Sequence, residues 1–105
     1  MSVETMQDIR DQVRSALRWV IDPELGINII DLGLIYDIAV QDGQVRVDMT
    51  MTTPACPLNA YLSSSAEDTI RRFVQDVKAV DINLVWEPPW NPTMMTDEAR
   101  EMLGW

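Results

Sequence analysis

The chain has 105 residues, of which 47% are hydrophobic and 24% charged, and its formal net charge is −9. This length and composition predict one globular domain, residues 1–105, with a single hydrophobic core. The acidic charge and the lack of any basic run exclude the cationic surface that nucleic acids or anionic membranes require.

Cysteine and histidine usage narrows the possible chemistry. The chain has one cysteine, Cys56, and no histidine. No Ser-His-Asp or Cys-His catalytic pair and no histidine-based zinc site can therefore form within the chain. One cysteine forms no intrachain disulfide, the N-terminus M-S-V-E-T-M-Q-D is too acidic for a signal peptide, and no apolar stretch approaches the roughly 20 residues of a membrane span. We expect a cytoplasmic protein.

Apolar residues recur every three or four positions through residues 3–20, which predicts an amphipathic helix. Its apolar face consists of Val3, Met6, Ile9, Val13, Leu17 and Val20. The helix is expected to end near Asp22, because the residue before Pro23 avoids the helical conformation. Residues 22–33, D-P-E-L-G-I-N-I-I-D-L-G, have no clean periodicity and predict a structured loop with one short extended piece at residues 27–30.

A β-hairpin is predicted next. Apolar and polar residues alternate on both sides of Asp42-Gly43, a pair typical of a two-residue type I′ turn. The turn and the alternation give the same register, with three apolar pairs on one face: Val40 opposite Val45, Ile38 opposite Val47, and Tyr36 opposite Met49. That register also places Asp37 opposite Asp48, a mildly unfavourable like-charge pair that Arg46 can offset.

A second helix, a third strand and an irregular tail complete the chain. The helical apolar face consists of Leu58, Leu62, Ala66, Ile70, Phe73 and Val77. Residues 80–86 alternate as a strand does, and Trp86 is expected to cover the open end of the core. The following E-P-P-W-N-P-T-M-M-T has three prolines, which predicts no regular structure. Thr96 can cap a short last helix that ends at Gly104.

The predicted fold class is α/β, as a two-layer α+β domain. The element order is α-β-β-α-β, followed by a short C-terminal helix. Two helices covering one face of a small mixed sheet is the natural packing for this order.

Cys56 lies in T-T-P-A-C-P-L, between the predicted hairpin and the second predicted helix. Unpaired N–H groups and the positive end of the macrodipole at a helix N-terminus favour a thiolate, and Pro57 suits the first helical position. Such a thiolate could bind a metal, attack a substrate or form a mixed disulfide. The alternative is a small buried hydrophobic side chain, which describes most free cysteines.

Four segments in order resemble one known family. They are D-P-E-L-G from Asp22, I-I-D-L-G-L-I-Y ending at Tyr36, T-T-P-A-C-P around Cys56, and P-P-W-N-P-T-M-M-T-D-E-A-R ending at Arg100. Together they are similar to the metal–sulfur cluster assembly domain family, which includes SufT-type and PaaD-type proteins. Each motif alone is weak, but the four at this spacing are specific and cover nearly the whole chain.

The resemblance implies a compact α/β fold related to the C-terminal domain of NifU-type scaffolds. It also implies a non-catalytic role in assembling iron–sulfur clusters, as a carrier or adaptor that delivers clusters to client proteins. PaaD-like members instead mature a multicomponent oxygenase. The family's site residues carry over as Asp22, Glu24, Thr52, Thr53 and Cys56, with Cys56 as candidate thiolate ligand of iron or a transient cluster.

One thiolate does not hold a cluster alone, since clusters usually take four cysteine ligands. A homodimer would supply two, and small thiols, a scaffold or an apo-client could supply more. The hydroxyls of Thr52 and Thr53 can instead satisfy backbone groups near Pro54, and Asp22 can cap a turn.

Large apolar side chains in the proline-rich tail suggest a partner contact. Trp90, Met94 and Met95 lie on a rigid segment, where aromatic and methionine side chains are good anchors. The alternative for each is a place in the core. Two other functions also remain open for the whole chain: a thiol-dependent enzyme with Cys56 as nucleophile and Asp22 or Glu24 as proton acceptor, and an interaction module with a structural cysteine.

Overall fold

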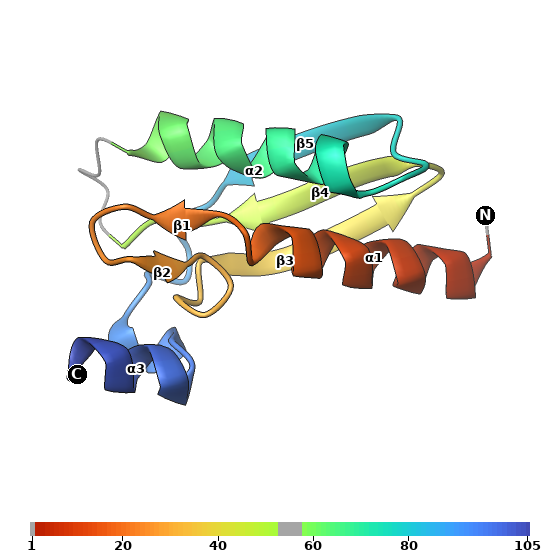
Figure 1. Cartoon of the computed structure of the whole chain (residues 1–105). Coiled ribbons are helices and arrows are strands. Elements are labelled where there is room, and N and C mark those ends of the chain that lie inside the picture. Colours follow the sequence, from red (N-terminus) through yellow and green to blue (C-terminus); the bar gives the residue numbers. More distant parts are fainter. Residues whose placement is uncertain (1, 53–57) are drawn as a thin grey trace.

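A computed structural model describes residues 2–52 and 58–105 as a layer of two helices on a small sheet, with a C-terminal segment below it (Figure 1). Its elements in chain order are α1 (Val3–Leu17), β1 (Ile21–Asp22), β2 (Ile27–Asn28), β3 (Ile35–Gln41), β4 (Gln44–Met49), α2 (Asn59–Phe73), β5 (Ala79–Leu84), the 3₁₀ turn η1 (Pro92–Met94) and α3 (Asp97–Leu103). The two-layer α+β class with a mixed sheet is confirmed.

The main sheet has three strands in the order β3-β4-β5. Strands β3 and β4 are antiparallel, whereas β4 and β5 are parallel, with α2 as the connection. Helices α1 and α2 cover one face of this sheet, as predicted (Figure 1). The core between the layers includes fully buried side chains from α1, the loop after β2, β4 and α2: Leu17, Ile29, Leu32, Met49, Leu62 and Ile70.

Helix α1 is shorter than its sequence pattern predicted. Ser2 caps its N-terminus by accepting a hydrogen bond from the Thr5 amide, and the helix ends at Leu17 instead of near Asp22. Val20 is buried but lies beyond the helix, where the chain turns to bring Ile21 and Asp22 into β1. Val3 is 67% exposed because the first turn of α1 extends past the core. The prediction that Val3 belongs to the buried apolar face was therefore wrong.

The loop after α1 contains a two-stranded ribbon instead of one extended piece. Strand β1 pairs with β2 through Ile21 with Asn28 and Asp22 with Ile27. Ile29 and Ile30 lie outside the ribbon, so the prediction of an extended piece over residues 27–30 was right only for its first half.

The hairpin of β3 and β4 has most of the predicted register. Val40 pairs with Val45, Ile38 with Val47, and the two carboxylates Asp37 and Asp48 stand opposite each other. Arg46 Nε lies 3.2 Å from Asp48 Oδ1, and Asn83 Nδ2 donates to the same oxygen. Both turn residues have positive φ, 51° at Asp42 and 82° at Gly43, as a type I′ turn requires.

The predicted pairing of Tyr36 with Met49 was wrong. A bulge between Ile35 and Asp37 places Ile35 opposite Met49 and leaves Tyr36 as the extra residue. Tyr36 is thereby directed to the C-terminal tail, where its hydroxyl donates to the Pro88 carbonyl at 2.7 Å.

Two aromatic side chains assigned to the core are instead exposed. In α2, Leu62, Ala66 and Ile70 are buried, but Phe73 at the helix end is 59% exposed. Strand β5 ends at Leu84, and Trp86 beyond it is 39% exposed, so Trp86 does not cover the core. Trp90 packs against the core in its place.

The tail is more regular than its three prolines suggested. Pro92–Met94 form the 3₁₀ turn η1, which Asn91 caps by accepting from the Thr93 amide. Thr96 caps α3 as predicted, accepting from the Ala99 amide, and Gly104 ends that helix with φ of 72°. Within residues 2–52 and 58–105, every helix is too short or too polar to span a bilayer.

Candidate functional site

The described residues of the predicted site, Asp22, Glu24 and Thr52, belong to one end of the molecule. The β1–β2 ribbon, the end of β4 that leads to Thr52, and the start of α2 at Asn59 lie together there (Figure 1). This arrangement puts the Asp22 loop and the end of the hairpin at one edge of the fold. Thr53 and Cys56 lie outside the described residues.

Asp22 is a buried carboxylate that organises its own turn. Its side chain is 4% exposed, and Oδ1 accepts hydrogen bonds from the amides of Glu24 at 2.8 Å and Leu25 at 3.3 Å. The Asp22 carbonyl accepts from the Gly26 amide at 2.7 Å. Asp22 therefore does what the capping alternative predicted, while Glu24 keeps an exposed carboxylate at the same end of the molecule.

Backbone hydrogen bonds tie this turn to the end of β4. The Ile29 amide donates to the Val20 carbonyl, the Leu34 amide donates to Ile29, and the Thr50 amide donates to Leu34 at 2.8 Å. Thr50 precedes the half-buried Thr52 by two residues. The loop that bears Asp22 and Glu24 is thus held in a fixed position relative to the chain entering the T-T-P-A-C-P motif.

The C-terminal tail supports the loop between β2 and β3 from below. Trp90 Nε1 donates to the Leu32 carbonyl at 2.7 Å, and the Thr96 amide donates to the Asp31 carbonyl at 2.9 Å. Asp31 is itself held by Asn28, whose Nδ2 donates to Asp31 Oδ2 at 3.0 Å and whose Oδ1 accepts from the Asp31 amide. These bonds join the I-I-D-L-G-L-I-Y motif and the proline-rich motif into one structural unit.

Gly33 shows how closely the two motifs approach. Its φ is 75°, and a Cβ at this position would lie 2.7 Å from the carbonyl carbon of Met94 and closer still to its oxygen. Tyr36 adds a contact of 3.4 Å from its hydroxyl to Met94 Sδ. The sequence pattern did not predict that Gly33 and Tyr36 support the site, although a glycine within an apolar run was the available signal.

The predicted partner anchors differ in burial. Met95 is 5% exposed and belongs to the core, which gives it a structural role. Trp90 is half-buried, with its indole N–H bound to Leu32, and Met94 is half-buried against Tyr36. A partner role for these residues stays a prediction, and only Trp90 and Met94 leave part of their side chains accessible.

The described residues do not assemble a metal site of their own. Within residues 2–52 and 58–105, no three side chains among histidine, cysteine, aspartate and glutamate gather closely enough to hold a metal ion. The full sequence contains one thiol, that of Cys56, and no imidazole. A single copy of the chain therefore offers a cluster at most one of the soft ligands that iron–sulfur clusters prefer.

Comparison with known proteins gives sequence relatives that match all or most of the chain. A chain from Porphyromonas gingivalis described as an Fe-S protein maturation auxiliary factor is 44% identical over 105 residues, covering 99% of this chain and 98% of the relative. The Fe-S protein maturation auxiliary factor SufT of Staphylococcus aureus is 41% identical over 86 residues, covering 81% of this chain and 97% of that protein.

Solved structures share the fold. A domain of unknown function from Bacillus anthracis superposes with a TM-score of 0.95 at 32% identity, covering 98% of both chains. The sequence model of the family described as "Iron-sulfur cluster assembly protein" matches residues 10–82. That range contains the first three motifs, strands β1 to β4, helix α2, the second half of α1 and most of β5, and it is most of the chain. This chain belongs to the iron–sulfur cluster assembly protein family.

Proposed function

We propose that this protein is a non-catalytic maturation factor that carries iron or an iron–sulfur cluster, or positions one, for delivery to apo-client proteins in the cytoplasm. Cys56 is the proposed thiolate ligand, and the cluster is cargo. Asp22, Glu24, Thr52 and Thr53 form the polar surroundings of that ligand.

The incomplete ligand set is the observation that carries the proposal. One cysteine and no histidine cannot complete the usual four-cysteine coordination of a cluster, and the described residues supply no carboxylate cluster in its place. The remaining ligands would come from small thiols, a scaffold or the client itself. Such shared coordination is labile, which suits transfer better than permanent electron-transfer chemistry.

The rigid support of the site is consistent with an adaptor. The Asp22 turn, the end of β4 and the tail are linked by hydrogen bonds to backbone groups, so the surface next to Thr52 has a fixed shape for a partner to recognise. Glu24 is exposed on this surface and is available to a partner or a ligand. Asp22 is not equally available, because Oδ1 already accepts two amide hydrogen bonds.

The names of the relatives favour a general role. The Porphyromonas and Staphylococcus proteins are described as Fe-S protein maturation auxiliary factors, without restriction to one client. We therefore propose general cluster maturation in preference to service for a single oxygenase.

Anaerobic reconstitution with iron and sulfide tests the proposal. Wild-type protein should retain iron after desalting and should activate an apo-client such as an aconitase-type enzyme, whereas Cys56→Ser should lose both properties. Met102→Ser is the matched control, because it also replaces a sulfur-containing side chain by serine, at a position that is 72% exposed on α3. Equal iron content and equal client activation in wild type and Cys56→Ser would refute the role of the thiol.

A further inference from the structure

Strand β5 forms one edge of the main sheet, and its outer side has no neighbouring strand among residues 2–52 and 58–105. The Ala79 amide, where the strand begins, donates to the Gly43 carbonyl of the hairpin turn. The Val85 amide, just beyond the end of the strand, donates to Met49 of β4. The N–H and C=O of one residue point to the same side of a strand, and that side alternates from residue to residue. The backbone groups that point outward are therefore those of Val80, Ile82 and Leu84.

This outer edge lacks the features that usually protect an exposed strand. Native proteins commonly interrupt or shield such an edge with a bulge, a proline or a lysine. Strand β3, the other edge of the sheet, has a bulge between Ile35 and Asp37. Strand β5 reads A-V-D-I-N-L, without proline or lysine, and it pairs with β4 in unbroken register from Ala79 to Leu84. The outer side of β5 is thus a regular edge on which an additional strand can pair.

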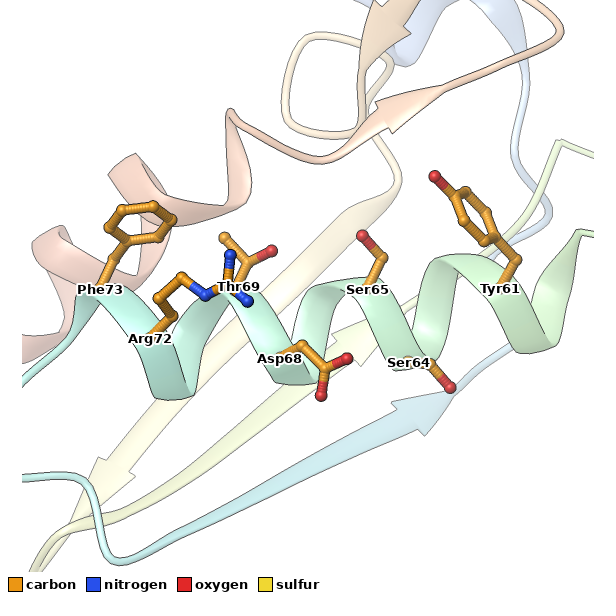
Figure 2. A pocket seen from close by; sticks show the side chains of 7 residues that line it. All are labelled: Tyr61, Ser64, Ser65, Asp68, Thr69, Arg72 and Phe73. Atoms are coloured by element: carbon orange, nitrogen blue, oxygen red, sulfur yellow. The ribbon is translucent and has the colours of Figure 1, made fainter.

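A hollow of about 240 Å³ lies between this edge and α2. It is lined by three α2 residues and three β5 residues: Ser63, Ser64, Glu67, Val80, Asp81 and Ile82. Figure 2 shows Ser64 directed away from Ser65 and Thr69, on the side of α2 where β5 lies. Because the serine side chains are small, space beside β5 is left open for the side chains of an added strand.

The apolar side chains of β5 beside this hollow are incompletely covered. Ile82 lies next to Val47 of β4 and therefore faces the helical layer as Val47 does. Leu84 lies next to Met49 in the same way. The two β4 residues are fully buried, whereas Ile82 and Leu84 are only half-buried. A strand paired with β5 would cover them with apolar side chains on the same face and remove their remaining surface from water.

The charges near the edge indicate which kind of strand fits. Two of the residues that line the hollow are carboxylates, Glu67 and Asp81, and the other four are uncharged. Arg71 approaches Glu67 only to 3.9 Å, between partly exposed side chains. The arginine beside Asp81 in the sheet, Arg46, already pairs with another carboxylate at 3.2 Å. With a net charge of −9 on the whole chain, this edge attracts a cationic segment and repels a second copy of the chain.

We propose that the outer edge of β5 docks an extended segment of a partner protein in which apolar residues alternate with lysine or arginine. The segment pairs with the outward backbone groups of β5 and extends the sheet by one strand. Its apolar side chains cover Ile82 and Leu84, and its cationic side chains lie on the opposite face, beside Asp81. The alternation of the segment thus matches the alternation of β5 itself.

A segment docked in this way leads to the candidate functional site. Strands β4 and β5 are parallel, so both end at the end of the molecule that holds Thr52 and the Asp22 turn (Figure 1). A partner that lies along β5 is therefore held beside the proposed site of cargo transfer. That consequence rests on the proposed maturation function, whereas the docking itself does not require Cys56 to bind cargo.

An NMR titration with a synthetic peptide that alternates lysine and valine tests the docking. The backbone amide signals of Val80, Ile82 and Leu84 should shift to saturation, and these amides should exchange more slowly with solvent in the complex. The amides of Asp81 and Asn83 point to β4 and should gain little protection, which makes them an internal reference. The same peptide with its central amides N-methylated keeps its charge but cannot pair with a strand, and it should not bind.

Charge reversal on β5 tests the choice of partner. Asp81→Lys should raise the dissociation constant of the lysine–valine peptide at least about fivefold and should improve binding of a glutamate–valine peptide. Asp37→Lys is the matched control, because Asp37 is an exposed carboxylate on the same face of the sheet but at the β3 edge. It makes the same change in net charge and should bind the lysine–valine peptide within about twofold of wild type.

The same measurements can overturn the proposal. Absence of a saturable shift, shifts confined to other elements, or equal binding of the N-methylated peptide would each reject docking on β5. Dimers of the free protein in sedimentation velocity, with slow exchange at the outward β5 amides, would identify a second copy as the occupant instead. Cys56→Ser should bind the peptide as wild type does, so loss of peptide binding and loss of iron retention are separate results.

Discussion

Trp90 Nε1 donates a 2.7 Å hydrogen bond to the backbone carbonyl of Leu32, 58 residues earlier in the chain. This bond connects the proline-rich tail to the loop between β2 and β3. The loop is in turn bonded to Thr50 at the end of β4, since the Thr50 amide donates to the Leu34 carbonyl. Trp90 is thus part of the support for the candidate site, although it lies outside the range that the family model matches.

Trp90→Phe should reduce the free energy of unfolding by about 1 to 2 kcal/mol, because the carbonyl of the buried Leu32 loses its donor while the aromatic packing is largely kept. Urea denaturation measures the loss. Trp86→Phe is the control, since Trp86 is 39% exposed and lies outside the core, and its effect should stay within about 0.5 kcal/mol. Equal losses for the two variants would contradict a specific role for the Trp90 bond.

Gly33→Ala should be markedly destabilising. The added Cβ would overlap the Met94 carbonyl, and the residue would also have to keep a φ of 75°. We expect a loss of about 3 kcal/mol in urea denaturation, from backbone strain together with displacement of the tail.

Gly26→Ala separates the two causes of that loss. Gly26 has a similar φ of 71°, but beyond its chain neighbours no atom lies within 4 Å of the position that an added Cβ would take. This variant should lose only the strain of the left-handed conformation, about 1 kcal/mol. A loss at Gly33 no larger than that at Gly26 would show that the contact with Met94 is not limiting.

The helices show what periodicity can and cannot predict. Apolar residues at intervals of three and four predicted both helices and the face of each helix that meets the sheet. This works because the residues on one face of a helix recur at that interval. The ends were predicted poorly. Val3 and Phe73 lie at helix ends that extend past the core, and the pattern alone does not reveal how far the underlying sheet reaches.

Val13→Ala and Val3→Ala test the difference between the packed middle and the exposed end of α1, because the same side chain is shortened at both positions. Val13 is fully buried and Val3 is 67% exposed on the same helix. We expect Val13→Ala to lose about 2 kcal/mol of unfolding free energy and Val3→Ala to stay near zero, since only the first leaves a cavity. Thermal or urea unfolding of both proteins measures the effect, and similar losses would mean that the first turn of α1 is packed after all.

The candidate site was predictable in part. The sequence places Asp22 and Thr52 each beside a boundary of regular structure, and the structure brings both to one end of the fold. The bulge at Tyr36 and the bonds from Trp90 and Thr96 could not be predicted, because they join irregular segments that have no periodicity. Asp31 and Gly33 could be recognised in the sequence only as parts of a family motif. Their contacts with the tail, which explain why these residues are needed, could not be predicted.

Asp22→Asn tests whether the buried carboxylate serves the fold or the cargo. The amide keeps an oxygen that can accept from Glu24 and Leu25, so stability and client activation should both stay close to wild type. Asp22→Ala removes the acceptor and should lose about 1 to 2 kcal/mol in urea denaturation, because two part-buried amides are left without it. Glu24→Gln, the same kind of change at an exposed neighbour, should leave stability within about 0.5 kcal/mol of wild type.

One outcome would contradict a purely structural role for Asp22. An Asp22→Asn protein that is stable but no longer retains iron or activates the client would show that the negative charge itself is needed at the site. Asp22 would then act on the cargo in addition to its role in the turn.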